Sequence, residues 1–189
     1  MKRIILFLIV SSISFVLMSS CKKGEDDPSI SFRSRDSRFE GNWKIKLIDY
    51  VGSFSDTSGK KTYSIVLNGS ILNYTQTENG VENQTTLTDY NMNIEIKKNN
   101  DYTFVQTFLL NGESRNHSYS RKWHWLNSNK TLVFMSIDCG SVRSFDRWHL
   151  RELKNKELVL VMESNSDYKN TSRTEKETIS LRLEFEKVK

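Results

Sequence analysis

Hydrophobic and polar residues alternate along most of the chain from residue 39 onward. Met92, Ile94 and Ile96, for example, are separated by polar or charged residues, and so are Ile179, Leu181, Leu183 and Phe185 near the end. A period of two is that of a β-strand with one buried face. No segment has the longer period of an extended amphipathic helix. The pattern predicts one all-β domain over residues 39–189.

Turn signals separate these strands at intervals of 10 to 15 residues. The pair Asn111-Gly112 is a strong signal for a two-residue hairpin. Closely spaced antiparallel strands favour an up-and-down arrangement, and closure of such a sheet into a barrel would remove its exposed edges. We therefore expect an up-and-down antiparallel β-barrel of about eight to ten strands, some of the candidate segments merging, with a polar loop over residues 163–176. The candidate strands are 42–51, 61–67, 70–77, 83–89, 90–98, 101–110, 114–125, 130–137, 144–153, 157–165 and 176–187.

The first 20 residues have a different pattern. Lys2 and Arg3 precede an apolar run over residues 4–18, and the small residues Ser19 and Ser20 lead to Cys21. A transmembrane helix needs about 20 apolar residues, so this run is typical of a secretory signal. A cysteine directly after the small pair resembles a lipobox, and we expect residues 1–20 to be removed and Cys21 to be acylated. An ordinary secretory signal with a chance cysteine is the alternative.

Residues 21–38 are polar, without apolar periodicity, and predict a flexible tether. Within it, Lys23-Gly24-Glu25-Asp26-Asp27 is similar to the acidic surface-export signal of lipoproteins in the Bacteroidota. A solvated linker whose charges carry no signal explains the same residues equally well. Neither Lys22 nor Lys23, the two residues directly after Cys21, is an aspartate, so the inner-membrane retention signal is absent. These features predict a lipid-anchored protein of the outer membrane and leave its periplasmic or cell-surface face open.

Charge and cysteine content exclude several classes of function. Removal of Lys2 and Arg3 with the signal lowers the formal net charge from +5 to +3. No stripe of basic residues interleaved with aromatics is present, so we do not expect nucleic-acid binding. With Cys21 acylated, Cys139 is the remaining cysteine, and an intramolecular disulfide is impossible. We expect a buried Cys139 rather than a nucleophile, because no histidine or asparagine is placed to support catalysis.

The start of the first strand carries a family resemblance. Gly41-Asn42-Trp43 resembles the Gly-x-Trp opening of lipocalins, and the later Trp123-His124-Trp125, Trp148-His149-Leu150 and Phe185-Glu186-Lys187 are similar to small lipocalin-like lipoproteins of the Bacteroidota. The resemblance implies a lipocalin-like barrel in which Trp43 plugs one end. It also implies an arginine packed over that tryptophan, for which Arg182 is the candidate.

Large aromatic residues dominate the predicted inner face. They favour a barrel interior filled with side chains, or a shallow apolar cup at one mouth, over a deep ligand cage. Gln106 and Arg121 are polar residues in register with these aromatics, and such groups must be hydrogen-bonded or lie near water. The candidate ligand cavity is therefore lined by Phe104, Gln106, Phe108, Arg121, Trp123 and Trp125.

The sequence contains no motif that predicts catalysis. His117, His124 and His149 do not have the spacing of a metal site. We therefore expect neither an enzyme nor a cofactor or metal. The leading hypothesis is a non-catalytic, membrane-anchored binding module for a small apolar ligand. The alternative is an interaction or structural subunit of an outer-membrane complex, with an outer-membrane protein as partner, a filled barrel and no ligand.

Overall fold

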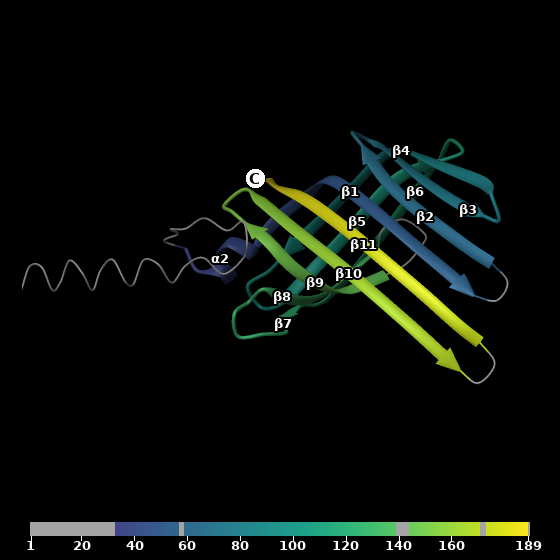
Figure 1. Ribbon diagram of the computed structural model, residues 1–189. Helices are drawn as coiled ribbons and strands as arrows, with labels where there is room; N and C mark the ends of the chain where they lie inside the picture. Colours follow the sequence, from purple (N-terminus) through teal and green to yellow (C-terminus); the bar gives the residue numbers. More distant parts are fainter. Residues whose placement is uncertain (1–32, 57–58, 139–143, 171–172, 189) are drawn as a thin grey trace, which may run out of the picture.

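The computed structural model describes residues 33–56, 59–138, 144–170 and 173–188, and it is built almost entirely of β-strands (Figure 1). The all-β, antiparallel class predicted from the alternation is confirmed, although the sheet has eleven strands rather than eight to ten. Cys21 and Cys139 lie outside the described residues. The elements are α2 (Arg35–Phe39), β1 (Gly41–Asp56), β2 (Gly59–Asn68), β3 (Ile71–Glu78), β4 (Val81–Ile96), β5 (Asp101–Leu110), β6 (Glu113–Lys122), β7 (His124–Trp125), β8 (Leu132–Asp138), β9 (Ser144–Leu153), β10 (Glu157–Asn170) and β11 (Arg173–Val188).

All eleven strands belong to one sheet, in the order β6-β5-β4-β3-β2-β1-β11-β10-β9-β8-β7. Two meanders, β1 to β6 and β7 to β11, are joined side by side by the pairing of β1 with β11. The edge strands β6 and β7 are separated in the sequence by Trp123 alone. Side chains of β5 and β6 reach β8: the hydroxyls of Tyr102 and Tyr119 donate to the Ser136 carbonyl at 2.8 and 2.9 Å. The sheet therefore curls until its two ends touch through side chains.

The sheet is wider at one end because β1 and β4 change partners along their length. Near α2, Gly41–Lys44 of β1 pair directly with Asn93–Ile96 of β4. Both strands then contain a register shift, between Ile45 and Leu47 in β1 and between Thr88 and Asn91 in β4. Beyond these bulges, which bend a strand, the β2–β3 hairpin lies between them. We call the α2 end the closed end and the other the wide end.

Several predicted boundaries differ from the observed strands. The segments 83–89 and 90–98 form one long strand, β4, whose bend is at the bulge with Asp89 at φ 51°. The segment 114–125 is divided into β6 and β7. The predicted polar loop over residues 163–176 is wrong, because β10 and β11 pair through Asn170 and Arg173. Backbone pairing continues there although the sequence is polar. Asn111 and Gly112 have φ of 53° and 81°, as the predicted hairpin turn requires.

The short helix α2 spans the predicted boundary at residue 38: its first four residues were assigned to the tether and its last, Phe39, to the domain. Ser34 precedes it and its side chain accepts a hydrogen bond from the Ser37 amide at 3.2 Å, which is the usual role of serine at a helix start. Arg35, Arg38 and Phe39 are buried against the sheet. Residues 35–38, assigned to the tether from the sequence, therefore form a helix that packs on the domain.

One hydrophobic core fills the inside of the curled sheet. Trp43, Tyr102, Phe104 and Trp148 are fully buried within it. Their neighbours along each strand are polar and face outward, as the alternation predicts. Burial of such aromatic side chains contributes roughly 1.5–3 kcal/mol each to stability.

Candidate functional site

Trp43 lies in the core of the closed end, directly beneath α2. Its indole N–H donates to the carbonyl of Phe39 at 2.8 Å, and the side chain has no exposed surface. The Lys187 ammonium lies 4.9 Å from the centre of the Trp43 ring and donates to the carbonyls of Arg38, at 3.1 Å, and Glu40. Burial lowers the pKa of Lys187. The basic residue over Trp43 is thus Lys187, which ties the last strand to the start of the domain.

Arg182, the candidate from the sequence for that contact, occupies the outer face of β11. Its Nε donates to Glu184 Oε1 at 2.8 Å, and its side chain is 37% exposed. Arg182 is offset by one residue from Leu181 and Leu183, which face the core. Because successive side chains of a strand point to opposite faces, Arg182 faces away from Trp43, and that assignment is wrong.

Trp123 and Trp125 also belong to the closed end. The rings of both lie 5.0 Å from the ring of Phe39, centre to centre, and 5.5 Å from each other. The indole N–H of Trp125 donates to Asp36 Oδ1 in α2 at 2.6 Å, and Asp36 also binds Lys130. These two tryptophans fix α2 to the sheet.

The four other predicted ligand residues lie along β5 and β6. Phe104 stacks on Tyr119 at 4.8 Å, and Gln106 donates to the Tyr90 hydroxyl at 2.7 Å. The guanidinium of Arg121 lies 4.7 Å from the centre of the Tyr119 ring. Phe104 and Gln106 have 0% and 1% exposed surface. A side chain that lined a water-sized cavity would retain accessible surface, so neither faces one.

The six predicted residues therefore do not line a single cavity. Trp123 and Trp125 pack at the closed end, Phe104 and Gln106 are enclosed in the core, and Arg121 is exposed beside the seam between β6 and β8. Phe108 alone among them is a partly exposed apolar side chain in the direction of the wide end.

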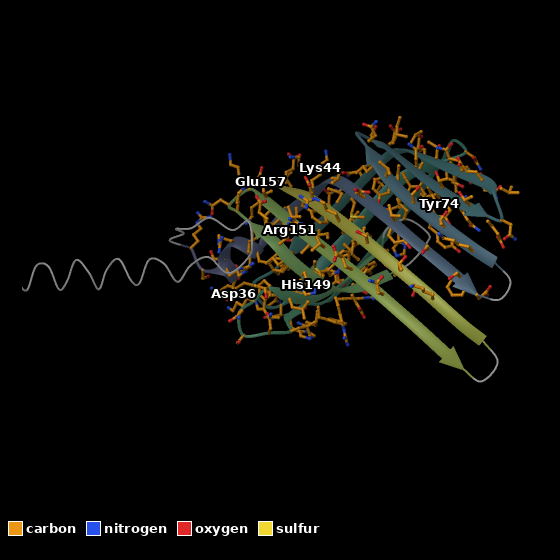
Figure 2. The ribbon with its side chains drawn as sticks, in the orientation of Figure 1. Asp36, Lys44, Tyr74, His149, Arg151 and Glu157 are labelled. Atoms are coloured by element: carbon orange, nitrogen blue, oxygen red, sulfur yellow. The ribbon has the colours of Figure 1, made fainter. Side chains whose placement is uncertain are left out.

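The wide end has an inner face of partly exposed apolar side chains. Tyr63 and Tyr74, on β2 and β3, are nearly parallel with ring centres 6.5 Å apart, and the Tyr74 hydroxyl donates to Gln76 at 3.2 Å. Burial raises the pKa of Tyr74. Figure 2 shows Tyr74 far from Asp36, at the opposite end of the sheet. We call this surface the wide-end cup; its residues are Tyr63, Tyr74, Phe108, Leu110, Met162 and Ile179.

Sequence reasoning missed most of the wide-end cup, although the signal was present. Tyr63 shares its parity with Ile65 and Leu67 in β2, and Tyr74 shares its parity with Leu72 in β3. Alternation therefore places them on the inner face. Their grouping with β10 and β11 depends on the β1–β11 pairing, which the order of the strands in the sequence does not reveal.

A separate pocket of about 160 Å³ lies on the outer face of β1, β9, β10 and β11. Lys154 pairs there with Glu157 at 3.1 Å and with Glu152, and these carboxylates, Glu152 first, raise the pKa of Lys154 to about 12. The charged residues that line this pocket are Lys46, Glu152, Lys154, Glu157, Arg182 and Glu184. Opposite charges balance within this pocket, which gives it the character of a surface ion-pair network.

The histidines of the chain are spread over the surface. His117 lies 3.6 Å from Asp138, and His124 stacks on Phe134 at 5.0 Å. His149 is exposed on β9. Within residues 33–56, 59–138, 144–170 and 173–188, no three His, Cys, Asp or Glu side chains are grouped as a metal ion would require.

Comparison with known proteins does not add to this description. In the described part of the chain, no helix has the length and apolar character needed to span a membrane. No protein-family model and no curated protein matches the sequence. The candidate site is therefore the wide-end cup, defined by its geometry alone.

Proposed function

We propose that this protein is a lipid-anchored, lipocalin-like binding module of the outer membrane that holds a small apolar ligand in the wide-end cup. The observation that supports the proposal is the contrast between the two ends of one sheet. The closed end buries Phe39, Trp43 and Trp123 almost completely, whereas the wide end keeps aromatic side chains partly exposed on its inner face. Ligand pockets are typically concave, apolar and provided with a few polar groups.

The chemistry of the wide-end cup suits a flat apolar molecule with one polar group. Tyr63 and Tyr74 offer parallel ring faces, and Gln76 offers an amide beside them. Because Phe104 and Gln106 are enclosed, the ligand would occupy the mouth rather than the centre of the barrel. The sequence-based ligand site therefore moves from Trp123 and Trp125 to the opposite end, and the barrel remains a proposal that rests on the curled sheet.

A fluorescent apolar probe such as N-phenyl-1-naphthylamine tests this site. We expect one probe to bind per protein, and Tyr74→Ser or Phe108→Ser to weaken binding at least fivefold, because each removes a ring face of roughly 1 kcal/mol or more. Val66→Ser is the matched control, since Val66 is exposed on the outer face of β2. Equal affinity in all four proteins, or loss in the control alone, would contradict the proposal. Mass spectrometry of protein purified gently from membranes would then identify the natural ligand.

A docking role in an outer-membrane complex is the second candidate. Val51, Val66 and Ile71 are exposed by 57%, 44% and 43%, and they follow a diagonal across the outer faces of β1, β2 and β3. Diagonal neighbours in a sheet lie within reach of one another, so the three form one small apolar stripe. A stoichiometric protein that co-purifies with the native chain and is lost in Val66→Glu, with probe binding intact, would favour this role.

A further inference from the structure

Three turns of the closed end contain basic residues. Lys97 and Lys98 lie in the turn between β4 and β5, Lys130 in the turn between β7 and β8, and Lys154 and Lys156 in the turn between β9 and β10. These three turns contain no Asp or Glu. All three are at the α2 end, because Ile96 pairs with Gly41, Lys130 binds Asp36, and the Lys187 amide donates to the Lys156 carbonyl.

The turns of the wide end have the opposite character. Within the described residues, the β3–β4 turn is Asn79-Gly80 and the β5–β6 turn is Asn111-Gly112, and neither contains a charged residue. Glu78 and Glu113, in the strands beside them, pair with Lys61 and Arg115. The two ends of one sheet therefore differ in charge as well as in width.

Some lysines of the closed end are paired with acidic neighbours, which balance their charge, so the excess positive charge of these turns rests on Lys98 and Lys156. Lys97 pairs with Glu95 at 3.4 Å and remains 47% exposed, and Lys154 remains 48% exposed beside Glu152 and Glu157. Exposed ion pairs of this kind are weak. Lys98 and Lys156 are exposed at the tips of their turns. Both tips can therefore meet an external anion.

The chain enters the fold at this same end. Arg33 and Ser34 lead directly into α2, which is fixed to the sheet by Asp36 and Phe39. The eleven residues between Cys21 and Arg33 can reach about 40 Å at most. A lipid at Cys21 would hold the closed end near the membrane, where anionic headgroups attract basic residues.

We infer that the closed end is a membrane-docking face, whose lysine-bearing turns lie against anionic lipid headgroups. This inference rests on the proposed lipid anchor and adds an orientation to it. The wide-end cup then points away from the bilayer, toward the aqueous space from which a ligand would come. Asp36, which lies in α2, and Tyr74 are at opposite ends of the sheet in Figure 2, so a membrane at the α2 end would lie on the side away from Tyr74.

Hydrogen exchange of the native, membrane-purified protein in vesicles tests the docking face. We compare vesicles of phosphatidylcholine alone with vesicles that also contain phosphatidylglycerol. In the anionic vesicles, the amides of residues 97–100 and 154–157 should exchange more slowly, and those of Asn79-Gly80 and Asn111-Gly112 should not change. The double variant Lys98→Ser/Lys156→Ser should lose this difference, as should high salt, which screens surface charge. Lys60→Ser/Lys176→Ser removes the same charge from two exposed lysines outside these turns and should retain it.

The intact mass of the same protein separates failure of the anchor from failure of the docking face. If the mass includes acyl chains and exchange is the same in both vesicles, or slows at the wide-end turns, the docking face is wrong and the anchor stands. If acyl chains are absent, sedimentation with anionic vesicles measures the face alone. The two-lysine variant should then bind about 25-fold more weakly, since each lysine near an anionic surface contributes about a fivefold factor. Equal sedimentation of variant and control would overturn the inference.

Discussion

Two tyrosine hydroxyls, those of Tyr102 and Tyr119, donate to the same backbone carbonyl in this fold. Their burial should be detectable as late ionisation when the pH is raised. Burial raises the pKa of Tyr102 to about 12 and raises the pKa of Tyr119 as well, while both hydroxyls donate to Ser136. Below pH 10 these phenols are protonated in the folded and unfolded states alike. Between pH 10 and about 12, the unfolded chain loses the Tyr102 proton and the folded chain keeps it, so the free energy of unfolding should fall as the pH rises.

Phenolate absorbance as a function of pH measures this effect. Tyr102→Phe should remove one of the tyrosines that ionise late and should flatten the loss of stability above pH 10. The urea-unfolded protein is the control, because all seven tyrosines should then ionise together near pH 10. A late step of unchanged amplitude in Tyr102→Phe would show that another tyrosine is responsible.

The sequence predicted correctly which side chains face the core wherever strand alternation alone determines the direction of a side chain. Trp43, Phe104 and Gln106 face inward as predicted. Lys187 could have been found in the same way, because it shares its parity with Phe185 and Leu183, whereas Arg182 does not. The crowding at Gly52 could not be predicted from the sequence. A Cβ at this position would lie 2.4 Å from the hydroxyl of Tyr50, two residues earlier. That contact depends on the rotamer of Tyr50, which packing sets.

At the scale of elements, α2 is the smallest and the one most dependent on tertiary contacts. A helix of five residues is too short to be stable alone, so its packing must hold it. Phe39→Ala should lower the free energy of unfolding by about 3–5 kcal/mol, because Phe39 is fully buried between Trp123 and Trp125. Ser37→Ala, an exposed change in the same helix, is the control and should stay within about 0.5 kcal/mol.

Urea denaturation monitored by tryptophan fluorescence measures both variants. In Phe39→Ala the native emission should also shift to longer wavelength, since Trp123 and Trp125 lose a neighbouring ring that shields them from water. An equal loss of stability in both variants would mean that helix formation, rather than the Phe39 packing, limits stability. An unshifted spectrum would mean that the sheet closes over the two tryptophans without α2.

The predicted strand boundaries were wrong where backbone pairing continues through residues whose side-chain pattern does not predict a strand. β4 has a break in its apolar pattern at Thr88 and Asp89, which predicts a turn, yet a bulge carries the strand through to Ile96. The polar residues after Met162 predict a loop, yet β10 and β11 continue because each supplies the other's backbone hydrogen bonds. Polar side chains do not prevent backbone pairing in an antiparallel hairpin. Hydrophobic periodicity cannot detect such strands.

Among the described residues, the seam between β6 and β8 has no backbone ladder. Elsewhere neighbouring strands share backbone ladders, whereas Ser136 is joined to β5 and β6 by three side chains: Tyr102, Tyr119 and Arg121, whose guanidinium donates to the Ser136 hydroxyl at 3.0 Å. Each such hydrogen bond contributes about 0.5–1.5 kcal/mol. Tyr119→Phe/Arg121→Met should therefore lower the free energy of unfolding by about 1–3 kcal/mol.

Hydrogen exchange should locate the effect of that double variant along the sheet. Stability differs between parts of a fold, and segments that open locally exchange before the rest. The amides of β6 and β8 should exchange faster than in the native protein, and those in the paired centre of β1 and β11 should keep their rates after correction for global stability. Lys122→Met is the control, because Lys122 is on β6 but faces outward, where it pairs with Asp101. Faster exchange in every strand would show that the sheet opens as one unit, and unchanged exchange at β6 would show that the seam is held without the hydrogen bonds of Tyr119 and Arg121.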